Sequence, residues 1–379
     1  MIHVLSIFGT RPEAIKMAPV VLELRDRPDE FRSEICVSAQ HRQMLDQVLR
    51  DFGLRADHDL DLMTTGQTPV QVASRLLAVV PRLLERRRPD VVLVQGDTMT
   101  TFAAAWASFL TGVPVGHVEA GLRTGDRRRP FPEEANRVLA TRVADLHFAP
   151  TARARDALLA ERVPADAVFL TGNPVIDALL RTVRADYRFA DPTLAALDPS
   201  RRLVLVTAHR RESFGRPIRS IFRAVARLAE RFPAVDFVVP VHPNPEVRRA
   251  AEEELPGRGN LVPLEPLDYR ELVHVLDRCH LVLTDSGGIQ EEAPSLGTPV
   301  LVLREVTERP EGVEAGTAIV VGTEGRRVFD AAARLLTDDG AHDRMARAVN
   351  PYGDGKAAIR IADALRERIP PAPAERPDW

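Results

Sequence analysis

Cysteine, lysine and aromatic residues are scarce in this chain of 379 residues. Cys36 and Cys279 are its two cysteines, and neither belongs to a CxxC or Cys/His spacing. This usage predicts a reducing, cytoplasmic location without structural zinc. No stretch approaches about 18 consecutive apolar residues and no basic region precedes the first apolar run, so we expect neither a membrane span nor a signal peptide. The net charge of −3, with both signs interspersed, argues against nucleic-acid or membrane partners.

The composition is that of a globular protein, with 45% hydrophobic and 28% charged residues. The length suggests about two to three domains. Of the 51 basic residues, lysines are found only at positions 16 and 356. GC-rich coding explains the excess of arginine, and a lysine retained against that bias can be needed as a lysine, which draws attention to Lys16.

Short β-branched runs alternate with helical periodicity along the whole chain. Continuous apolar strands that alternate with helices are typical of parallel sheets covered on both faces. The pattern restarts after about residue 200, so we predict an α/β fold with two Rossmann-like, doubly wound domains facing a cleft. The predicted strands are 4–8, 35–38, 91–95, 113–118, 146–149 and 168–170, then 203–207, 237–241, 281–284, 300–303 and 318–321.

Glycine and proline clusters indicate the boundaries of these domains. The first domain is predicted over residues 1–170 and the second over 171–354. A helix at about 355–369 is expected to pack back on the first domain, and the proline-rich residues 370–379 are expected to form a flexible tail.

The turn after the first strand has the composition of an anion site. Gly9 permits a tight turn, Pro12 suits the first turn of a helix, and Arg11 lies beside that helix N-terminus. Lys16 follows one helical turn later, on a face that it can share with Arg11. An ordinary capped turn is the alternative. No GxGxxG is present, so no dinucleotide cofactor is indicated.

Carboxylates follow the next strands of the first half, where α/β sheets bind ligands. Asp97 is either a helix N-cap or a chemical group. His117 and Glu119 are two apart on a predicted strand and should face one way. They form either a site or a buried pair that orders the loop. Glu133 opens a helix, where its ordinary role is to pair with the helix dipole and with Arg137.

The second half places basic residues and glycines at its strand ends. His209 begins the run HRR directly after a strand, and a diphosphate is its natural partner. The run from Ser286 to Gly288 passes from a strand straight into a helix, which suits a phosphate held by backbone N–H groups. Glu292 follows one turn later and is placed for ribose hydroxyls. These features indicate a nucleotide-sugar enzyme but do not choose the reaction.

At these positions the sequence resembles the non-hydrolysing UDP-N-acetylglucosamine 2-epimerases. The resemblance runs in order over nearly the whole chain and implies the two-domain GT-B fold. The matching stretches are FGTRPEAIKMAP (8–19), AQHRQMLDQ (39–47), QGDTMTT (95–101), GHVEAGLRTGD (116–126), PFPEEANR (130–137), TGNPVIDAL (171–179), TAHRRESFG (207–215), LTDSGGIQEEAPSLGTPVLVLRE (283–305), TERPEG (307–312) and NPYGDG (350–355).

The resemblance implies interconversion of UDP-GlcNAc and UDP-ManNAc without NAD, through loss of UDP to 2-acetamidoglucal and its re-addition. It also implies a bacterial homodimer without resident cofactor or metal. By resemblance the catalytic positions are Asp97, Glu119, Glu133 and His209, the substrate-binding positions are Arg11, Lys16, Arg137, Ser286, Gly287, Gly288, Glu292 and Arg309, and the positions of an allosteric UDP-GlcNAc site are Gln40, His41, Gln43 and His242.

Three other functions remain open from the sequence. A hydrolysing epimerase would release ManNAc and UDP. A GT-B glycosyltransferase would need an acceptor, for which no docking patch is evident. A nucleotide-sugar sensor would bind its ligand without turnover. The retained carboxylates argue against this function.

Overall fold

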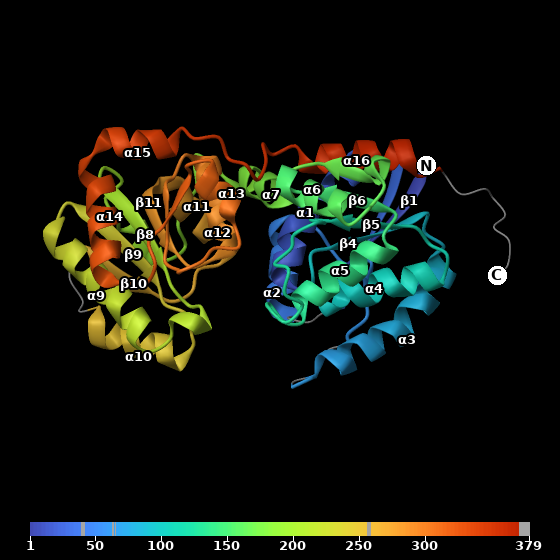
Figure 1. Ribbon diagram of the computed structural model, residues 1–379, viewed down its shortest axis with the longest axis horizontal. Helices are drawn as coiled ribbons and strands as arrows, with labels where there is room; N and C mark the ends of the chain where they lie inside the picture. Colours follow the sequence, from blue (N-terminus) through green and yellow to red (C-terminus); the bar gives the residue numbers. More distant parts are fainter. Residues whose placement is uncertain (39–41, 63, 65, 256–258, 371–379) are drawn as a thin grey trace. The chain divides into compact units, whose positions relative to one another are not determined.

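The chain forms two compact units, each with its own parallel sheet. The computed structural model describes residues 1–38, 42–62, 64, 66–255 and 259–370. The first unit comprises Met1–Arg181 and Tyr352–Trp379, and the second comprises Thr182–Pro351. Helices cover both faces of each sheet (Figure 1). The predicted α/β class with two Rossmann-like units is confirmed.

The sheet of the first unit has seven strands in the order β3-β2-β1-β4-β5-β6-β7, and all the recorded pairs are parallel. The order reverses between β1 and β4, which is the switch point where such sheets bind ligands. The strands are β1 (Ile2–Phe8), β2 (Phe31–Val37), β3 (His58–Asp59), β4 (Val91–Gln95), β5 (Val115–Val118), β6 (Leu146–Ala149) and β7 (Val168–Leu170).

Alternate residues of these strands face opposite layers of helices. Val4 and Phe8 of β1 contact the layer that contains α1, α2 and α16. Leu5 and Ile7 contact the layer that contains α3 and α4. The helices are α1 (Arg11–Arg25), α2 (Arg42–Asp51), α3 (Pro69–Arg87), α4 (Met99–Leu110), α5 (Glu133–Val143), α6 (Ala152–Ala160), η1 (Ala165–Ala167), α7 (Pro174–Thr182) and α16 (Ala357–Arg368).

The second unit has six strands in the order β10-β9-β8-β11-β12-β13, again with parallel pairing. The strands are β8 (Arg202–Thr207), β9 (Val235–Pro240), β10 (Leu261–Leu264), β11 (Cys279–Thr284), β12 (Val300–Val302) and β13 (Ala318–Val320). The helices are α8 (Pro192–Ala195), η2 (Arg211–Ser213), α9 (Arg216–Arg231), α10 (Pro245–Glu254), α11 (Tyr269–Arg278), α12 (Gly287–Glu292), η3 (Ala293–Leu296), α13 (Pro310–Glu314), α14 (Gly325–Thr337) and α15 (Asp339–Ala346).

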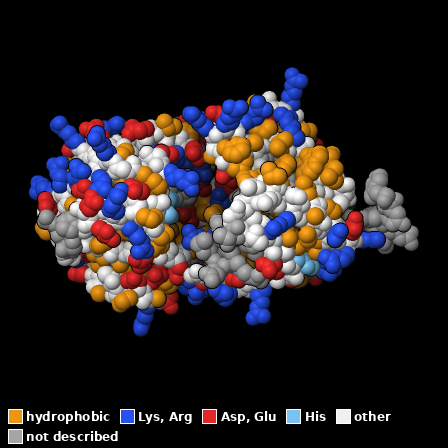
Figure 2. Space-filling model, turned by 90° about the horizontal axis from the view of Figure 1, so that it is seen from below, with side chains coloured by type: hydrophobic (Ala, Val, Ile, Leu, Met, Phe, Trp, Pro, Cys, Tyr) orange, Lys and Arg blue, Asp and Glu red, His pale blue; other side chains and the backbone are white. Residues whose placement is uncertain are grey.

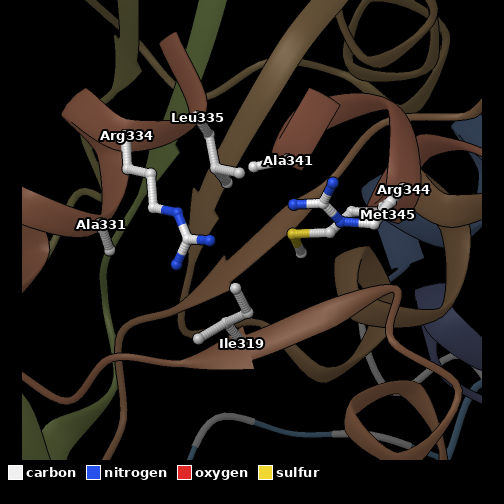
Figure 3. A pocket seen from close by; sticks show the side chains of 7 residues that line it. All are labelled: Ile319, Ala331, Arg334, Leu335, Ala341, Arg344 and Met345. Atoms are coloured by element: carbon white, nitrogen blue, oxygen red, sulfur yellow. The ribbon is translucent and has the colours of Figure 1, made fainter. Parts of the chain in front are cut away.

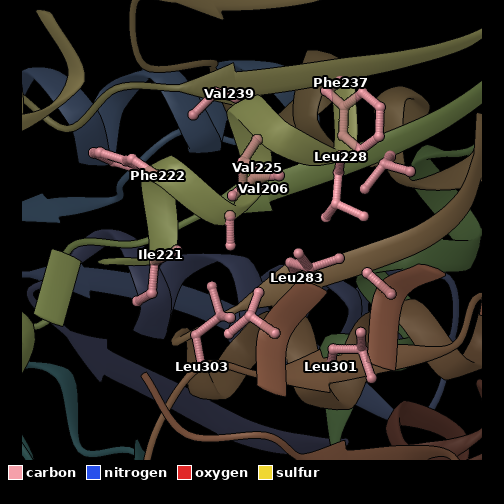
Figure 4. Close-up of a cluster of buried hydrophobic side chains, with 14 of the residues drawn as sticks. Val206, Ile221, Phe222, Val225, Leu228, Phe237, Val239, Leu283, Leu301 and Leu303 are labelled. Carbon is pink, nitrogen blue, oxygen red and sulfur yellow. The ribbon is translucent and has the colours of Figure 1, made fainter. Parts of the chain in front are cut away.

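One face of the second sheet carries the largest apolar cluster (Figure 4). Phe237 of β9 and Leu283 of β11 pack there against Phe222 and Leu228 of α9. These side chains are fully buried or nearly so, and burial of each contributes about 1.5–3 kcal/mol. In the described ranges no helix combines the length and the apolar character that crossing a membrane requires.

The first unit extends to Arg181 because the beginning of α7 is tied to the C-terminal segment. Asn173 donates its backbone N–H to the Tyr352 carbonyl at 2.7 Å. The buried Asp177 carboxylate accepts hydrogen bonds from the first two backbone N–H groups of α16, at 3.2 and 2.8 Å. Ile361 and Leu365 of α16 lie in the core of the first unit. The contact boundaries, 181/182 and 351/352, therefore differ from the 170/171 and 354/355 that the sequence suggested.

Candidate functional site

Glu119 lies at the centre of a polar cluster beyond the carboxyl ends of β4 and β5. Lys16 of α1 places its Nζ 2.6 and 2.7 Å from the two oxygens of the Glu119 carboxylate. Gln95 also donates a side-chain hydrogen bond to it, and Asn173 donates another at 3.2 Å. The Glu119 side chain is 4% exposed. A buried carboxylate held by a cation and two amides is ionised and fixed in orientation.

The backbone of Glu119 is in the left-handed region, with φ of 64°. This conformation is unusual for a residue other than glycine and is commonly found at functional sites. Strand β5 ends at Val118, so the alternation expected for His117 and Glu119 does not extend to Glu119. His117 Nε2 instead lies 2.7 Å from the Gly96 carbonyl oxygen. Burial lowers the pKa of His117 to about 4, which makes it neutral.

Asp97 pairs with α5 and does not cap α4. The cap is Thr98, whose hydroxyl accepts the Thr101 N–H at 3.1 Å. Asp97 Oδ2 lies 2.6 Å from Arg137 Nη2. Asn136 donates to the Asp97 backbone carbonyl at 2.8 Å. Since Thr98 takes the cap, the Asp97 carboxylate is left for Arg137 beyond the carboxyl end of β4, with 26% of the Asp97 side chain exposed.

Glu133 is the first residue of α5. Its Oε2 atom is buried and has no hydrogen-bond partner among the described residues. Arg137, the expected helix partner of Glu133, is recorded in ion pairs with Asp97 and Glu134 instead. This oxygen can accept a hydrogen bond from a ligand.

Glu13 is a member of the site that the sequence reasoning did not single out. Its Oε2 accepts the backbone N–H groups of Gly9 and Thr10 at 3.1 and 2.7 Å. Its Oε1 accepts the Thr98 hydroxyl at 2.7 Å. Glu13 therefore joins the turn that carries Arg11 to the turn that carries Asp97. The sequence did contain a local signal for Glu13, because Thr10 lies three residues earlier and the two residues form a capping box.

The predicted anion turn is a capped helix start with an exposed Arg11. Arg11 is the first residue of α1, and Thr10 is its N-cap. Lys16 is used differently from the expectation of a face shared with Arg11, because its ammonium group reaches Glu119. Thus Lys16 belongs to the carboxylate cluster of this unit.

In the second unit, Asp285 organises the strand ends around His209. The buried Asp285 Oδ2 accepts the backbone N–H groups of His209 and Arg210 at 2.7 and 2.8 Å. Its Oδ1 lies 3.2 Å from His209 Nδ1. Burial, together with Arg210 and His242, lowers the pKa of His209 and outweighs the opposing effect of Asp285. The lowered pKa favours a neutral imidazole near pH 7 rather than the cation that the sequence suggested.

Cationic side chains converge on the turn formed by Ser286, Gly287 and Gly288. A Cβ atom on Gly287 would lie 3.6 Å from Arg309 Nη2 and 3.9 Å from Arg210 Nη2. A Cβ on Gly288 would lie 3.8 Å from Glu292 Oε2. The absence of side chains at the two glycines keeps this space open, and the guanidinium groups suit an anion there.

Two partners hold the charged residues of this turn in place. Glu291 accepts a hydrogen bond from Arg309. Tyr269 donates its hydroxyl to Glu292 Oε1 at 3.2 Å. The sequence reasoning did not identify Asp285 or Tyr269 as members of the site, because a buried partner in another element leaves no local signal.

The allosteric UDP-GlcNAc site predicted from the sequence includes His242, whose side chain is described. Its ring stacks on that of His209, with the centroids 5.3 Å apart. Gln40 and His41 lie outside the described residues, and so does the side chain of Gln43 in α2. The grouping of these four residues stays a prediction.

Comparison with known proteins gives the family. A sequence model of the UDP-N-acetylglucosamine 2-epimerase family matches residues 23–366. The chain belongs to this family. The UDP-N-acetylglucosamine 2-epimerase of Yersinia pestis is 52% identical over 371 residues, which cover 96% of this chain and 98% of the relative. The one from Bacillus subtilis is 50% identical over 364 residues, covering 96% and 95%.

The fold of this epimerase-family chain also matches a solved structure with a ligand. The UDP-GlcNAc 2-epimerase from Neisseria meningitidis, bound to UDP-GlcNAc, superposes with a TM-score of 0.87 at 43% identity. The match covers 97% of this chain and 100% of that structure. Members of the family thus share both units and their order along the chain.

Proposed function

We propose that this chain interconverts UDP-GlcNAc and UDP-ManNAc by epimerisation at C2, without NAD or a resident metal. The observation that carries the proposal is the carboxylate cluster of the first unit. Glu119 is held by Lys16, and Asp97 is held by Arg137 of the helix that Glu133 begins. The sequence similarity to named epimerases supports the same substrate pair.

The chemistry requires UDP to leave before the C2 proton. No carbonyl stands beside C2, so that proton is only weakly acidic. When the C1–O bond breaks, its electron pair stays with UDP and C1 becomes oxocarbenium-like, which acidifies C2. Loss of the C2 proton to a carboxylate gives 2-acetamidoglucal. A proton then returns to the other face of C2, and UDP adds back at C1.

Two carboxylates are needed for proton transfer on the two faces of the sugar. We assign these roles to Asp97 and Glu133. The Oε2 atom of Glu133 has no hydrogen-bond donor among the described residues, which supports its assignment to a role toward the substrate. Glu119 is assigned to electrostatic support of the cationic sugar, because Lys16, Gln95 and Asn173 already hold its carboxylate in the ionised form.

The second unit supplies the groups for the leaving nucleotide. Arg309 and Arg210 lie beside Gly287 and would neutralise the diphosphate as it departs. The backbone of the turn at Ser286, Gly287 and Gly288 can approach the phosphates, and Glu292 is placed for the ribose hydroxyls. With Nδ1 of neutral His209 beside the Asp285 carboxylate, its Nε2 can accept a hydrogen bond. Arg11, exposed at the start of α1, is assigned to the substrate as well.

Proton NMR of the purified protein with UDP-GlcNAc in D₂O, without added NAD or metal, tests the proposal. We expect UDP-ManNAc to rise to a constant ratio with deuterium at C2. Free ManNAc and UDP alone would instead identify a hydrolysing epimerase. An unchanged spectrum would indicate a transferase without its acceptor, a different sugar or a sensor.

Variants test the assigned carboxylates in the same assay. Asp97→Asn and Glu133→Gln should each slow epimerisation by about 10²–10⁴-fold, the usual contribution of an acid–base group. Asp126→Asn is the matched control, because this exposed loop carboxylate lies outside the cluster. Wild-type rates in both test variants would overturn the assigned roles.

We further propose that the protein is a homodimer formed through α4 and α5. Trp106, Phe109 and Leu110 of α4 are 37%, 54% and 63% exposed, and Leu139 of α5 is 48% exposed. Figure 2 shows hydrophobic side chains gathered on the displayed face of the first unit. Such a patch is typical of an interface. Light scattering should give twice the chain mass, and Phe109→Asp should give the monomer.

The proposed location is the cytoplasm. Cys36 and Cys279 are free, buried thiols in strands of different units. Burial raises the pKa of Cys36 to about 12, so this thiol is inert in a reducing compartment.

A further inference from the structure

A pocket of about 290 Å³ lies in the second unit between α14, α15 and β13, the edge strand of the sheet. None of its lining residues is among the groups proposed to bind the nucleotide. Its lining residues are Ile319 of β13, Ala331, Arg334 and Leu335 of α14, and Ala341, Arg344 and Met345 of α15 (Figure 3).

Two guanidinium groups reach this pocket from different helices. In Figure 3 the side chains of Arg334 and Arg344 point from opposite sides toward the space between Leu335 and Ile319. Both arginines are exposed, and neither has an ion pair with a residue that the structure describes. Like charges that converge without a carboxylate between them repel each other.

Two nearby arginines, one in α14 and one just after α15, do have acidic partners. Arg326 pairs with Asp330 of α14 at 3.7 Å, and Arg347 pairs with Asp343 of α15 at 3.0 Å. Asp338, just before α15, is used as the cap of that helix and accepts the Ala341 N–H at 2.9 Å. Arg327 of α14 likewise has no ion pair among the described residues, so Arg334 and Arg344 are distinguished by their place in the lining of the pocket.

We propose that this pocket binds a small amphipathic organic anion, an alkyl or aryl group that bears a carboxylate, phosphate or sulfonate. The apolar part would lie on Ile319, Leu335 and Met345, and the anionic group between Arg334 and Arg344. Guanidinium groups bind such oxyanions with paired hydrogen bonds. The volume is near the lower end of ligand sites, which are commonly about 300–1,000 Å³, so the ligand is smaller than a nucleotide sugar. The inference does not depend on the proposed function.

Binding of 8-anilino-1-naphthalenesulfonate, followed by fluorescence on the full-length protein, tests the pocket. The titration is run with and without excess UDP-GlcNAc, so that binding at the nucleotide turn is recognised by competition. We expect one saturable site that UDP-GlcNAc does not displace. The double variant R334Q/R344Q should weaken it about tenfold or more, as loss of charge-assisted hydrogen bonds predicts.

Two further variants make the test specific. Ala331→Phe keeps both charges but fills the pocket, and should also abolish saturable binding. Arg347→Gln removes a charge just after α15 that does not line the pocket, and this variant should bind the probe like the wild type. Circular dichroism checks that each variant is folded. Wild-type binding in R334Q/R344Q and in Ala331→Phe, or equal weakening in Arg347→Gln, would overturn the proposal.

Discussion

Lys16 and Glu119, 103 residues apart in the sequence, form an ion pair in which the lysine Nζ contacts both carboxylate oxygens, at 2.6 and 2.7 Å. The Lys16 side chain is 15% exposed and that of Glu119 is 4% exposed. Water therefore screens the pair weakly, and each group depends on the other for its charged state. The pair connects α1 to the loop that follows β5.

Removal of one member of this pair should destabilise the protein strongly. Lys16→Met leaves the Glu119 carboxylate buried without its cation, and an uncompensated charge of this kind costs about 3–5 kcal/mol. Urea denaturation should show this loss. The double variant Lys16→Met/Glu119→Gln should recover part of it, because no buried charge remains. A double variant as unstable as the sum of both single variants would contradict the coupling.

Glu13→Gln should slow turnover while substrate binding changes little. An amide places an NH₂ group where one carboxylate oxygen now accepts hydrogen bonds, so it cannot satisfy both Gly9 and Thr98 as Glu13 does. The turn that carries Asp97 should shift, and we expect kcat to fall about tenfold or more with a smaller change in KM.

Glu23→Gln is the matched control for Glu13, because Glu23 also lies on α1 and is paired with Arg27 at 2.7 Å. A KM effect without a kcat effect in Glu13→Gln would show that Glu13 serves binding alone. Steady-state kinetics on both variants distinguishes the two results.

Arg309→Lys should weaken the nucleotide contact although the charge is kept. The planar guanidinium of Arg309 donates a hydrogen bond to Glu291 and also reaches the space beside Gly287. A lysine ammonium group cannot do both. We expect KM for UDP-GlcNAc to rise about tenfold. Arg248→Lys, whose arginine bonds the exposed Glu265 at 2.6 Å, should leave KM unchanged. Similar KM values in both variants would exclude Arg309 from the site.

Stability should fall as the pH is lowered from about 6.5 to about 4. Burial lowers the pKa of His117, His147 and His280 to about 4 from an ordinary value of 6.5. Below pH 6.5 the unfolded chain takes up protons that the folded chain does not, so acid favours unfolding. Each such histidine lowers the free energy of unfolding by about 1.4 kcal/mol for every pH unit of acidification within that window.

Urea denaturation at several pH values measures this slope for the free energy of unfolding. His280→Gln should reduce the slope, because one group with a lowered pKa is gone. A free energy that stays constant between pH 6.5 and 4 would contradict the assignment of neutral, buried histidines.

Local sequence signals were sufficient for most strands and failed for β3 and β10, two of the edge strands. The prediction of 91–95 matches β4, and 203–207 lies within β8. The edge strands β3 and β10 were not predicted. β3 is two residues long and polar, and β10 contains a proline. Short edge strands need no continuous apolar run, so they lack the pattern on which the prediction rests.

The sequence by itself determined the α/β class, the two units and the turns that carry polar residues, because apolar runs, glycines and prolines act locally. Only the tertiary structure decided what several of those residues contact. Asp97 was equally a cap or a chemical group until Thr98 was found as the cap and Arg137, 40 positions away, as the partner of Asp97. Glu13 and Asp285 joined the sites in the same way. Their hydrogen-bond partners belong to other strands and turns, and only packing of the sheet brings such groups within bonding distance.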